Sequence, residues 1–313
     1  MPLGLRRGTV TAVLEARPEF VELEVDDVPC IAYPRLTGPV EVGDDVLVNE
    51  QARLLELGSG GFDILYANLT RGLGLPVAEG AHVMKLPYTP GQVALKHEEE
   101  TGELAPSLEG LPVVLCTLHS QVAPVCTALA GSRVAYVQVA GGALPVSLSD
   151  TVRALKERAL VGVAVAVAPC LDGDVECATA AAALAWSARE GYDAVVCSVG
   201  PGIVGTGSRL GHGALTLADA TNAASALGGR PVLAVRTSSA DARDRHRGVS
   251  HHTRAVLDLC LGEVIVADDV GGAGWEEACA GLTLEHMGRA PGEDPSFFRA
   301  AFAAGVAARK LLG

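Results

Sequence analysis

The chain has 313 residues, of which 49% are hydrophobic and 19% are charged, and its formal net charge is −13. This hydrophobic content is enough for packed cores in roughly two domains and excludes a disordered chain. The acidic balance, without a Lys/Arg run that could neutralise phosphates, argues against nucleic acid as a partner.

Residues 1–75 are expected to form a small antiparallel β-barrel. Short strand-forming stretches are separated by turn signals such as Gly38-Pro39, and the alternation in FVELEV (20–25) is typical of a strand with one buried face. The expected strand-forming stretches cover residues 8–16, 20–33, 46–57 and 62–69. Residues 76–109 are less regular, and we expect them to join the barrel to a second domain.

Residues 110–313 are expected to form an α/β domain. Continuous apolar runs alternate with segments of helical period, and strands that are apolar throughout are typical of a parallel sheet covered on both faces. The apolar runs lie at 111–118, 133–140, 160–168, 193–199, 230–236 and 263–268. The sequence therefore predicts a doubly wound, mostly parallel sheet after the barrel, without indicating the strand order.

The helices between these runs have clear end signals. Ser250 is expected to be an N-cap, Asp294 an N-cap followed by Pro295 at the first helical position, and Gly191 and Gly262 are expected to end helices. The expected helices lie at 147–160, 175–191, 215–229, 250–262 and 293–312.

The cysteines and the apolar runs bear on localisation. Eight Cys without a C-x-x-C pair, in a chain this long, predict reduced thiols. The first ten residues, MPLGLRRGTV, lack the apolar core of a secretory signal, and the longest apolar run, 159–170, is too short to span a membrane. We therefore expect a cytoplasmic protein with no membrane partner.

The loops that follow the predicted strands concentrate the polar chemistry of the chain. Six of the eight His lie beyond residue 110, and five of those six lie in these loops. Ligands of open parallel sheets bind beyond the carboxyl ends of the strands, so we expect a site at that edge. The alternative is that these loops are polar only because they are solvated.

The stretch 200–213, GPGIVGTGSRLGHG, is the first candidate. It satisfies G-x-G-x-x-G after a strand, but it follows the fourth strand of the domain, and Arg236 stands where an acidic residue would end the next strand. An Arg there suits a 2′-phosphate, which keeps an NADP-dependent oxidoreductase as an alternative. A P-loop interpretation fails because Ser208 stands where the Lys must be.

This stretch can still bind an anion through exposed backbone N–H groups. The anion-binding residues expected here are Gly202, Gly205, Gly207, Ser208 and Arg209. The alternative is that the glycines only permit tight turns.

The second candidate is 241–252, DARDRHRGVSHH. If Ser250 caps a helix, His251 and His252 lie in its first turn, where the helix dipole favours neutral imidazole and attracts anions. The anion-binding residues expected around this stretch are Arg236, Arg243, Arg245, Arg247 and Ser250. The candidates for proton transfer are His119, His246 and His251.

Two further interpretations of the second candidate remain open. A metal would use His246, His252 and Asp241, although no H-E-x-x-H or C-x-x-C spacing supports it. A surface network of Arg–Asp pairs holding a long loop would explain the same residues.

Three stretches resemble an uncharacterised bacterial family of unknown function and of about this length. They are HVMKLPYTPGQ (82–92), the glycine-rich 200–213, and RHRGVSHHT (245–253). The similarity extends over most of the chain. It implies a cytosolic bacterial protein and makes the NADP and P-loop interpretations less attractive. It transfers no catalytic residue.

We expect a protein that binds, or acts enzymatically on, a small anionic metabolite, such as a phosphorylated one, at the carboxyl edge of the sheet. One alternative is a non-enzymatic regulatory protein whose barrel contacts a partner. A second is the NADP-dependent oxidoreductase. A homo-oligomer is compatible with the sequence, which indicates no particular cofactor.

Overall fold

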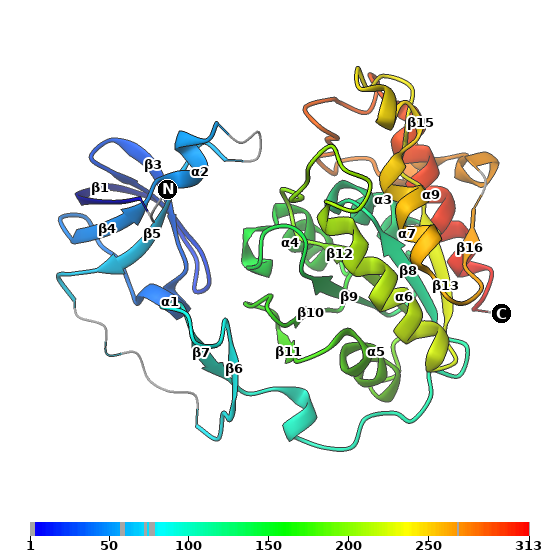
Figure 1. Cartoon of the computed structure of the whole chain (residues 1–313), viewed down its shortest axis with the longest axis horizontal. Coiled ribbons are helices and arrows are strands. Elements are labelled where there is room, and N and C mark those ends of the chain that lie inside the picture. The colour runs from blue at the N-terminus through cyan, green and yellow to red at the C-terminus, as the bar shows by residue number, and fades with distance from the viewer. Residues whose placement is uncertain (1–3, 57–59, 72–73, 75–78, 268, 313) are drawn as a thin grey trace. The chain divides into compact units, whose positions relative to one another are not determined.

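The computed structural model describes residues 4–56, 60–71, 74, 79–267 and 269–312. The chain forms two compact units, residues 1–95 and 96–313 (Figure 1). The joining segment expected at 76–109 is divided between them. Its residues 76–78, and the ends of two expected strands at residues 57 and 268, lie outside the described residues.

The first unit contains the expected barrel. Its five strands close in the order β1-β2-β3-β5-β4, and neighbouring pairs are antiparallel except for the parallel pair β3 and β5. The strands are β1 (Leu5–Ala16), β2 (Val21–Val25), β3 (Val28–Ala32), β4 (Asp45–Asn49) and β5 (Asp63–Asn68). In β2, Val21, Leu23 and Val25 are buried and the residues between them are half-buried, as the alternation predicts.

One expected strand of this unit is shorter than predicted. The strand expected at 46–57 ends at Asn49, and its second half begins with the short helix α2 (Gln51–Leu54). Gln, Ala, Arg and Leu are all strong helix formers, which explains the change. The helix α1 (Pro34–Thr37) and the hairpin of β6 (Val83–Lys85) with β7 (Val93–Leu95) complete the unit.

The second unit is built on the expected parallel sheet. Its seven described strands lie in the order β11-β10-β9-β12-β8-β13-β16, and every paired neighbour is parallel. The strands are β8 (Pro112–Cys116), β9 (Val134–Val139), β10 (Val163–Val167), β11 (Val175–Cys177), β12 (Ala194–Val199), β13 (Arg230–Ala234) and β16 (Ile265–Val266). β11 occupies the start of the helix expected at 175–191. That helix begins only after Thr179, whose side chain accepts the N–H of Ala182.

Helices cover both faces of this sheet (Figure 1). Val113 and Leu115 of β8 pack toward one apolar cluster, whereas Val114 and Cys116 pack toward another on the opposite face. The first cluster includes α5 (Ala180–Arg189), α6 (Thr216–Ala226) and α7 (His251–Leu259). The second includes α3 (Val122–Ala128), α4 (Asp150–Glu157) and α9 (Pro295–Arg309), of which α3 was not expected. The doubly wound architecture is thereby confirmed.

This unit also contains the two-stranded ribbon of β14 (Thr237–Ser238) with β15 (Gly248–Val249), and the short helix α8 (Trp275–Ala278). Asp294 precedes α9 as expected, but its side chain makes no capping hydrogen bond. All eight cysteines lie among the described residues, where none is in a disulfide, and seven are buried. Of the described helices, none combines the length and apolarity that crossing a bilayer requires.

Candidate functional site

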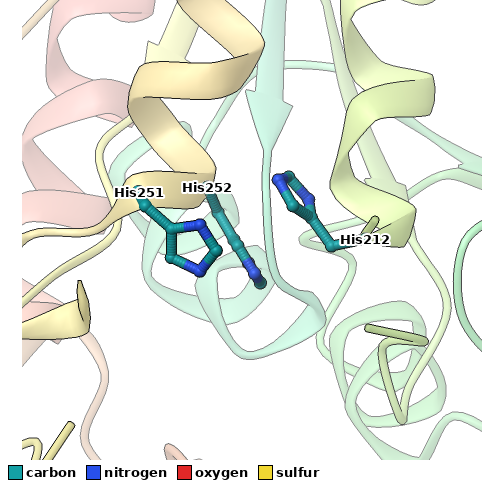
Figure 2. Close-up of side chains that lie close together, drawn as sticks. All are labelled: His212, His251 and His252. Carbon is teal, nitrogen blue, oxygen red and sulfur yellow. The ribbon is translucent and has the colours of Figure 1, made fainter. Parts of the chain in front are cut away.

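Four histidines from two segments of the chain meet near the carboxyl ends of the central strands β12, β8 and β13. His212 belongs to the loop after β12, whereas His246, His251 and His252 follow β13. The ring centroids are 3.8 Å apart for His212 and His252, 4.5 Å for His251 and His252, and 4.8 Å for His246 and His251. We term these four residues the histidine cluster. Figure 2 shows three of its rings between the first turn of α7 and the loop that leads into α6.

Ser250 fixes the members that follow β13. Its hydroxyl oxygen accepts the backbone N–H of His252 at 3.2 Å, which confirms Ser250 as the N-cap of α7. The same hydroxyl lies 2.8 Å from Nδ1 of His246, to which it can donate its proton. The N–H of Ser250 donates to the carbonyl of Arg236 at 2.8 Å. One serine therefore joins the helix start, His246 and the segment that leaves β13.

The glycine-rich loop at 200–213 folds back on itself and places His212 opposite Gly205. Gly213 crosses Gly141 so closely that a Cβ on Gly213 would lie 2.0 Å from the carbonyl oxygen of Gly141. The hydrogen bonds that close this hairpin run from Thr206 N–H to the Gly211 carbonyl, 2.7 Å, and from Gly213 N–H to the Val204 carbonyl, 2.8 Å. The loop therefore holds the backbone of His212 in a defined position.

The anion-binding residues predicted in this loop lie on its exposed part. They are Gly202, Gly205, Gly207, Ser208 and Arg209. The N–H of Ser208 donates to Thr206 at 3.1 Å, and Arg209 pairs with Asp258 at 2.7 Å. Helix α6 begins only at Thr216, so the loop lacks the glycine-to-helix junction of a dinucleotide site. This geometry favours positioning of His212 and gives the NADP interpretation no support.

Arg236 is a buried guanidinium beside the histidine cluster. It is 2% exposed, and its Nη1 donates to Nδ1 of His252 at 2.9 Å. Its Nε has no hydrogen-bond partner, and no carboxylate of the described residues forms an ion pair with it. Burial, and then the charge of Arg243, lower the pKa of Arg236 to about 10, so the guanidinium is still positive at neutral pH.

The carboxylates of this region are paired with other arginines. Asp241 is bound by Arg243 at 2.8 Å and by Arg289 at 3.5 Å, and Arg289 also binds Asp294 at 3.3 Å. The hydrogen bond from Arg243 holds the pKa of the Asp241 carboxyl well below its usual range. A carboxylate occupied in this way is poorly placed to ligate an ion, which disfavours the predicted metal set of His246, His252 and Asp241.

The two remaining predicted arginines are exposed. Arg247 pairs with Asp244 at 3.6 Å, as in a solvated surface network. Burial lowers the pKa of His251, and the positive charge of Arg245 adds to this shift. Of the predicted anion-binding residues, the structure therefore brings Arg236 and Ser250 into contact with the histidine cluster, and Arg243 and Arg245 near it.

All four histidines of the cluster favour the neutral form. Burial lowers the pKa of His246 to about 3 and that of His252 to about 2, and Arg236 adds to both shifts. Burial also lowers the pKa of His212, to which His251 adds. Each ring therefore offers one N–H donor and one nitrogen acceptor beside a positive guanidinium.

Comparison with known proteins identifies a family of unknown function. A family model described as a protein of unknown function, DUF3866, matches residues 29–270. The chain belongs to the DUF3866 family. A search of curated proteins finds no match. The DUF3866 match includes the histidine cluster and Arg236, and it ends before His286, Arg289 and Asp294.

Two buried histidines, His212 and His286, are not among the site residues predicted from the sequence. His212 is 6% exposed and neither of its ring nitrogens has a hydrogen-bond partner; the same holds for His286, which is 1% exposed and stacks on Phe297 at 3.6 Å. The sequence contained a signal for His212, because it ends the glycine-rich loop of the DUF3866 chain directly before a predicted helix. His286 follows no strand and had no comparable signal.

His119 lies apart from the histidine cluster and has structural partners. Its Nε2 is 2.6 Å from the hydroxyl of Ser149, which caps α4 by accepting the N–H of Val152 at 3.0 Å. Its Nδ1 is 3.3 Å from the carbonyl of Val199. Both ring nitrogens are thus engaged, which favours a role in positioning α4 over the predicted proton transfer.

Proposed function

We propose that the histidine cluster and Arg236 bind a small oxyanion, a phosphate- or carboxylate-bearing metabolite, at the carboxyl ends of β12, β8 and β13. One observation carries this proposal: Arg236 is a buried cation that forms no ion pair with a carboxylate of the described residues, and its Nε is unsatisfied. Asp241 acts on it only through its charge, and that carboxylate is bound by Arg243 and Arg289. A buried charge without a partner is costly, and an anion would remove that cost.

The neutral histidines support the same ligand. Because Arg236 donates to Nδ1 of His252, the neutral ring carries its proton on Nε2 and presents an N–H donor. His212 has two unpartnered ring nitrogens and His251 has an unpartnered Nε2. Imidazole N–H groups beside a guanidinium are suited to the oxygens of phosphate or carboxylate.

Calorimetric titration with inorganic phosphate, and with sulfate as a second oxyanion, tests the proposal. Replacing Arg236 by Met keeps the buried stem and removes the charge, so phosphate affinity should fall at least about tenfold, the loss of a charge-assisted hydrogen bond. Arg254→Met, an exposed arginine on α7, is the matched control and should leave affinity unchanged. Absence of phosphate and sulfate binding in the unaltered protein, or equal affinity in Arg236→Met, contradicts the proposal.

A second candidate is catalysis on the bound anion, with His251 moving a proton. His251 is only half-buried. Burial and the positive charge of Arg245 lower its pKa, so the ring is neutral at neutral pH and has a nitrogen that can accept a proton. Hydrolysis of p-nitrophenyl phosphate that is lost in His251→Ala would support this candidate. Phosphate binding without any turnover would support the non-enzymatic, regulatory alternative.

A further inference from the structure

We propose that His212, His251 and His252 also form a binding site for a divalent transition-metal ion such as Zn²⁺ or Co²⁺. The potential ligand atoms of these three residues all lie within 4.8 Å of one another (Figure 2). Imidazole nitrogen is a preferred ligand of these ions, and three histidines with an open fourth position form a known type of catalytic zinc site. This proposal does not depend on oxyanion binding.

The unpartnered nitrogens are the independent support. His212 is 6% exposed and neither of its ring nitrogens has a hydrogen-bond partner, and the buried Nε2 of His251 also has none. Buried polar atoms in proteins are nearly always satisfied by protein, water or an ion. An ion between the rings would satisfy one nitrogen of each.

The two elements that carry the ligands are held firmly. His212 is fixed by the glycine-rich hairpin and its crossing at Gly141, whereas His251 and His252 follow the N-cap Ser250. Zinc–nitrogen bonds are about 2.0–2.1 Å long, so the three nitrogens must approach more closely than 4.8 Å. The rings of His212 and His252 are stacked 3.8 Å apart, and side-chain rotation, above all of the half-buried His251, can bring the nitrogens together.

Arg236 competes with the metal for His252. Its Nη1 donates to Nδ1 of His252, so the proton of the neutral ring is on Nε2. Ligation through Nε2 requires that this proton leave and that Nδ1 take one up, which in turn requires Arg236 to release Nδ1. The positive guanidinium also repels the ion. Removal of Arg236 should therefore strengthen metal binding, whereas it should weaken oxyanion binding.

This opposition separates the two proposals experimentally. The full chain, treated with chelator and transferred to phosphate-free buffer, is titrated with Zn²⁺ by calorimetry and with Co²⁺ by its visible d–d bands. We expect one equivalent of metal to bind. His212→Ala and His251→Ala should each weaken metal affinity more than about tenfold, because loss of a residue that only supports a metal ligand already costs about that much. Arg236→Met should bind metal at least about tenfold more tightly.

Two control variants test whether binding is confined to the site. His82→Ala removes an exposed histidine of the first unit, and Cys260→Ser removes the thiol that is not fully buried. Both should bind metal as the unaltered chain does. Near-ultraviolet circular dichroism of every variant confirms that it is folded.

The proposal is overturned if no stoichiometric binding occurs, or if folded His212→Ala and His251→Ala both retain affinity. Loss in His246→Ala but not in His212→Ala would overturn it in favour of the set with His246, His252 and Asp241. Metal binding without phosphate binding would leave this proposal standing and contradict the proposed function, and the reverse result would do the opposite.

Discussion

Gly213 and Gly141 lie backbone to backbone: a Cβ on Gly213 would be 2.0 Å from the Gly141 oxygen, and a Cβ on Gly141 would be 2.4 Å from the Gly213 oxygen. No side chain fits between them, and His212 is the neighbour of one of the two. The backbone directly after His212 is therefore packed against the backbone at Gly141.

Gly213→Ala should therefore disturb both stability and binding. The methyl group must push apart two backbone segments, an overpacking that typically costs about 1–3 kcal/mol of unfolding free energy. We expect a lower melting temperature and, because His212 is displaced, weaker phosphate and metal binding in calorimetry. Gly207→Ala is the control, since nothing lies within 4 Å of its Cβ position, and it should change neither quantity.

Ser250→Ala should destabilise the start of α7. It removes the acceptor of the His252 N–H and the hydroxyl beside Nδ1 of His246. Loss of an N-cap serine costs about 1 kcal/mol, measurable by urea unfolding. Ser208→Ala, in the exposed part of the glycine-rich loop, should remain close to the unaltered protein. A Ser250→Ala protein of unchanged stability would show that the cap contributes nothing.

His119 should make the protein less stable in mild acid. Burial lowers its pKa in the folded chain to about 4, against an ordinary value of 6.5. Between these two pH values the unfolded chain binds a proton that the folded chain does not, so stability falls as the pH decreases from 6.5 toward 4. His119→Gln should show a shallower decrease in unfolding free energy over this range. His82→Gln, at an exposed position, serves for comparison, and equal slopes in the two variants would refute the prediction.

Asp241→Asn should destabilise the protein at neutral pH more than in strong acid. The Arg243 hydrogen bond lowers the pKa of Asp241, so its contribution is present above the unfolded value near 3.9 and is lost as the pH falls toward the folded pKa. Hydrogen bonds to charged groups are worth about 1.5–3 kcal/mol, and Arg243 is partly exposed, so we expect the lower end. Asp244→Asn, whose side chain is 95% exposed, should have almost no effect by urea unfolding.

The sequence predicted the fold because its signals are local. Continuous apolar runs, alternation in FVELEV and the cap at Ser250 each involve residues close in the chain, and the structure confirms the strands and helices they indicate. The short strand β11 was missed because three residues, Val175–Cys177, run directly into the helix start at Thr179.

The composition of the candidate site depended on strand order, which the sequence does not contain. β12 and β13 flank β8 in the sheet, and this arrangement brings His212 to His252 across forty residues of chain. His119 was predicted to transfer protons for the same reason. Its ring nitrogens contact Ser149 and Val199, which are distant in the sequence, and no local pattern indicates these contacts.

Arg289 has a consequence for how much of the chain must be present for folding. It binds Asp241, in the loop after β13, and Asp294, at the start of α9, and both carboxylates are buried. Ala301, Ala304 and Ala308 of the same helix cover one face of the sheet. A fragment that ends at residue 270, where the family match ends, would lack both Arg289 and the helix α9. The smallest autonomous folding unit of the α/β part therefore extends well beyond residue 270, into the C-terminal helix.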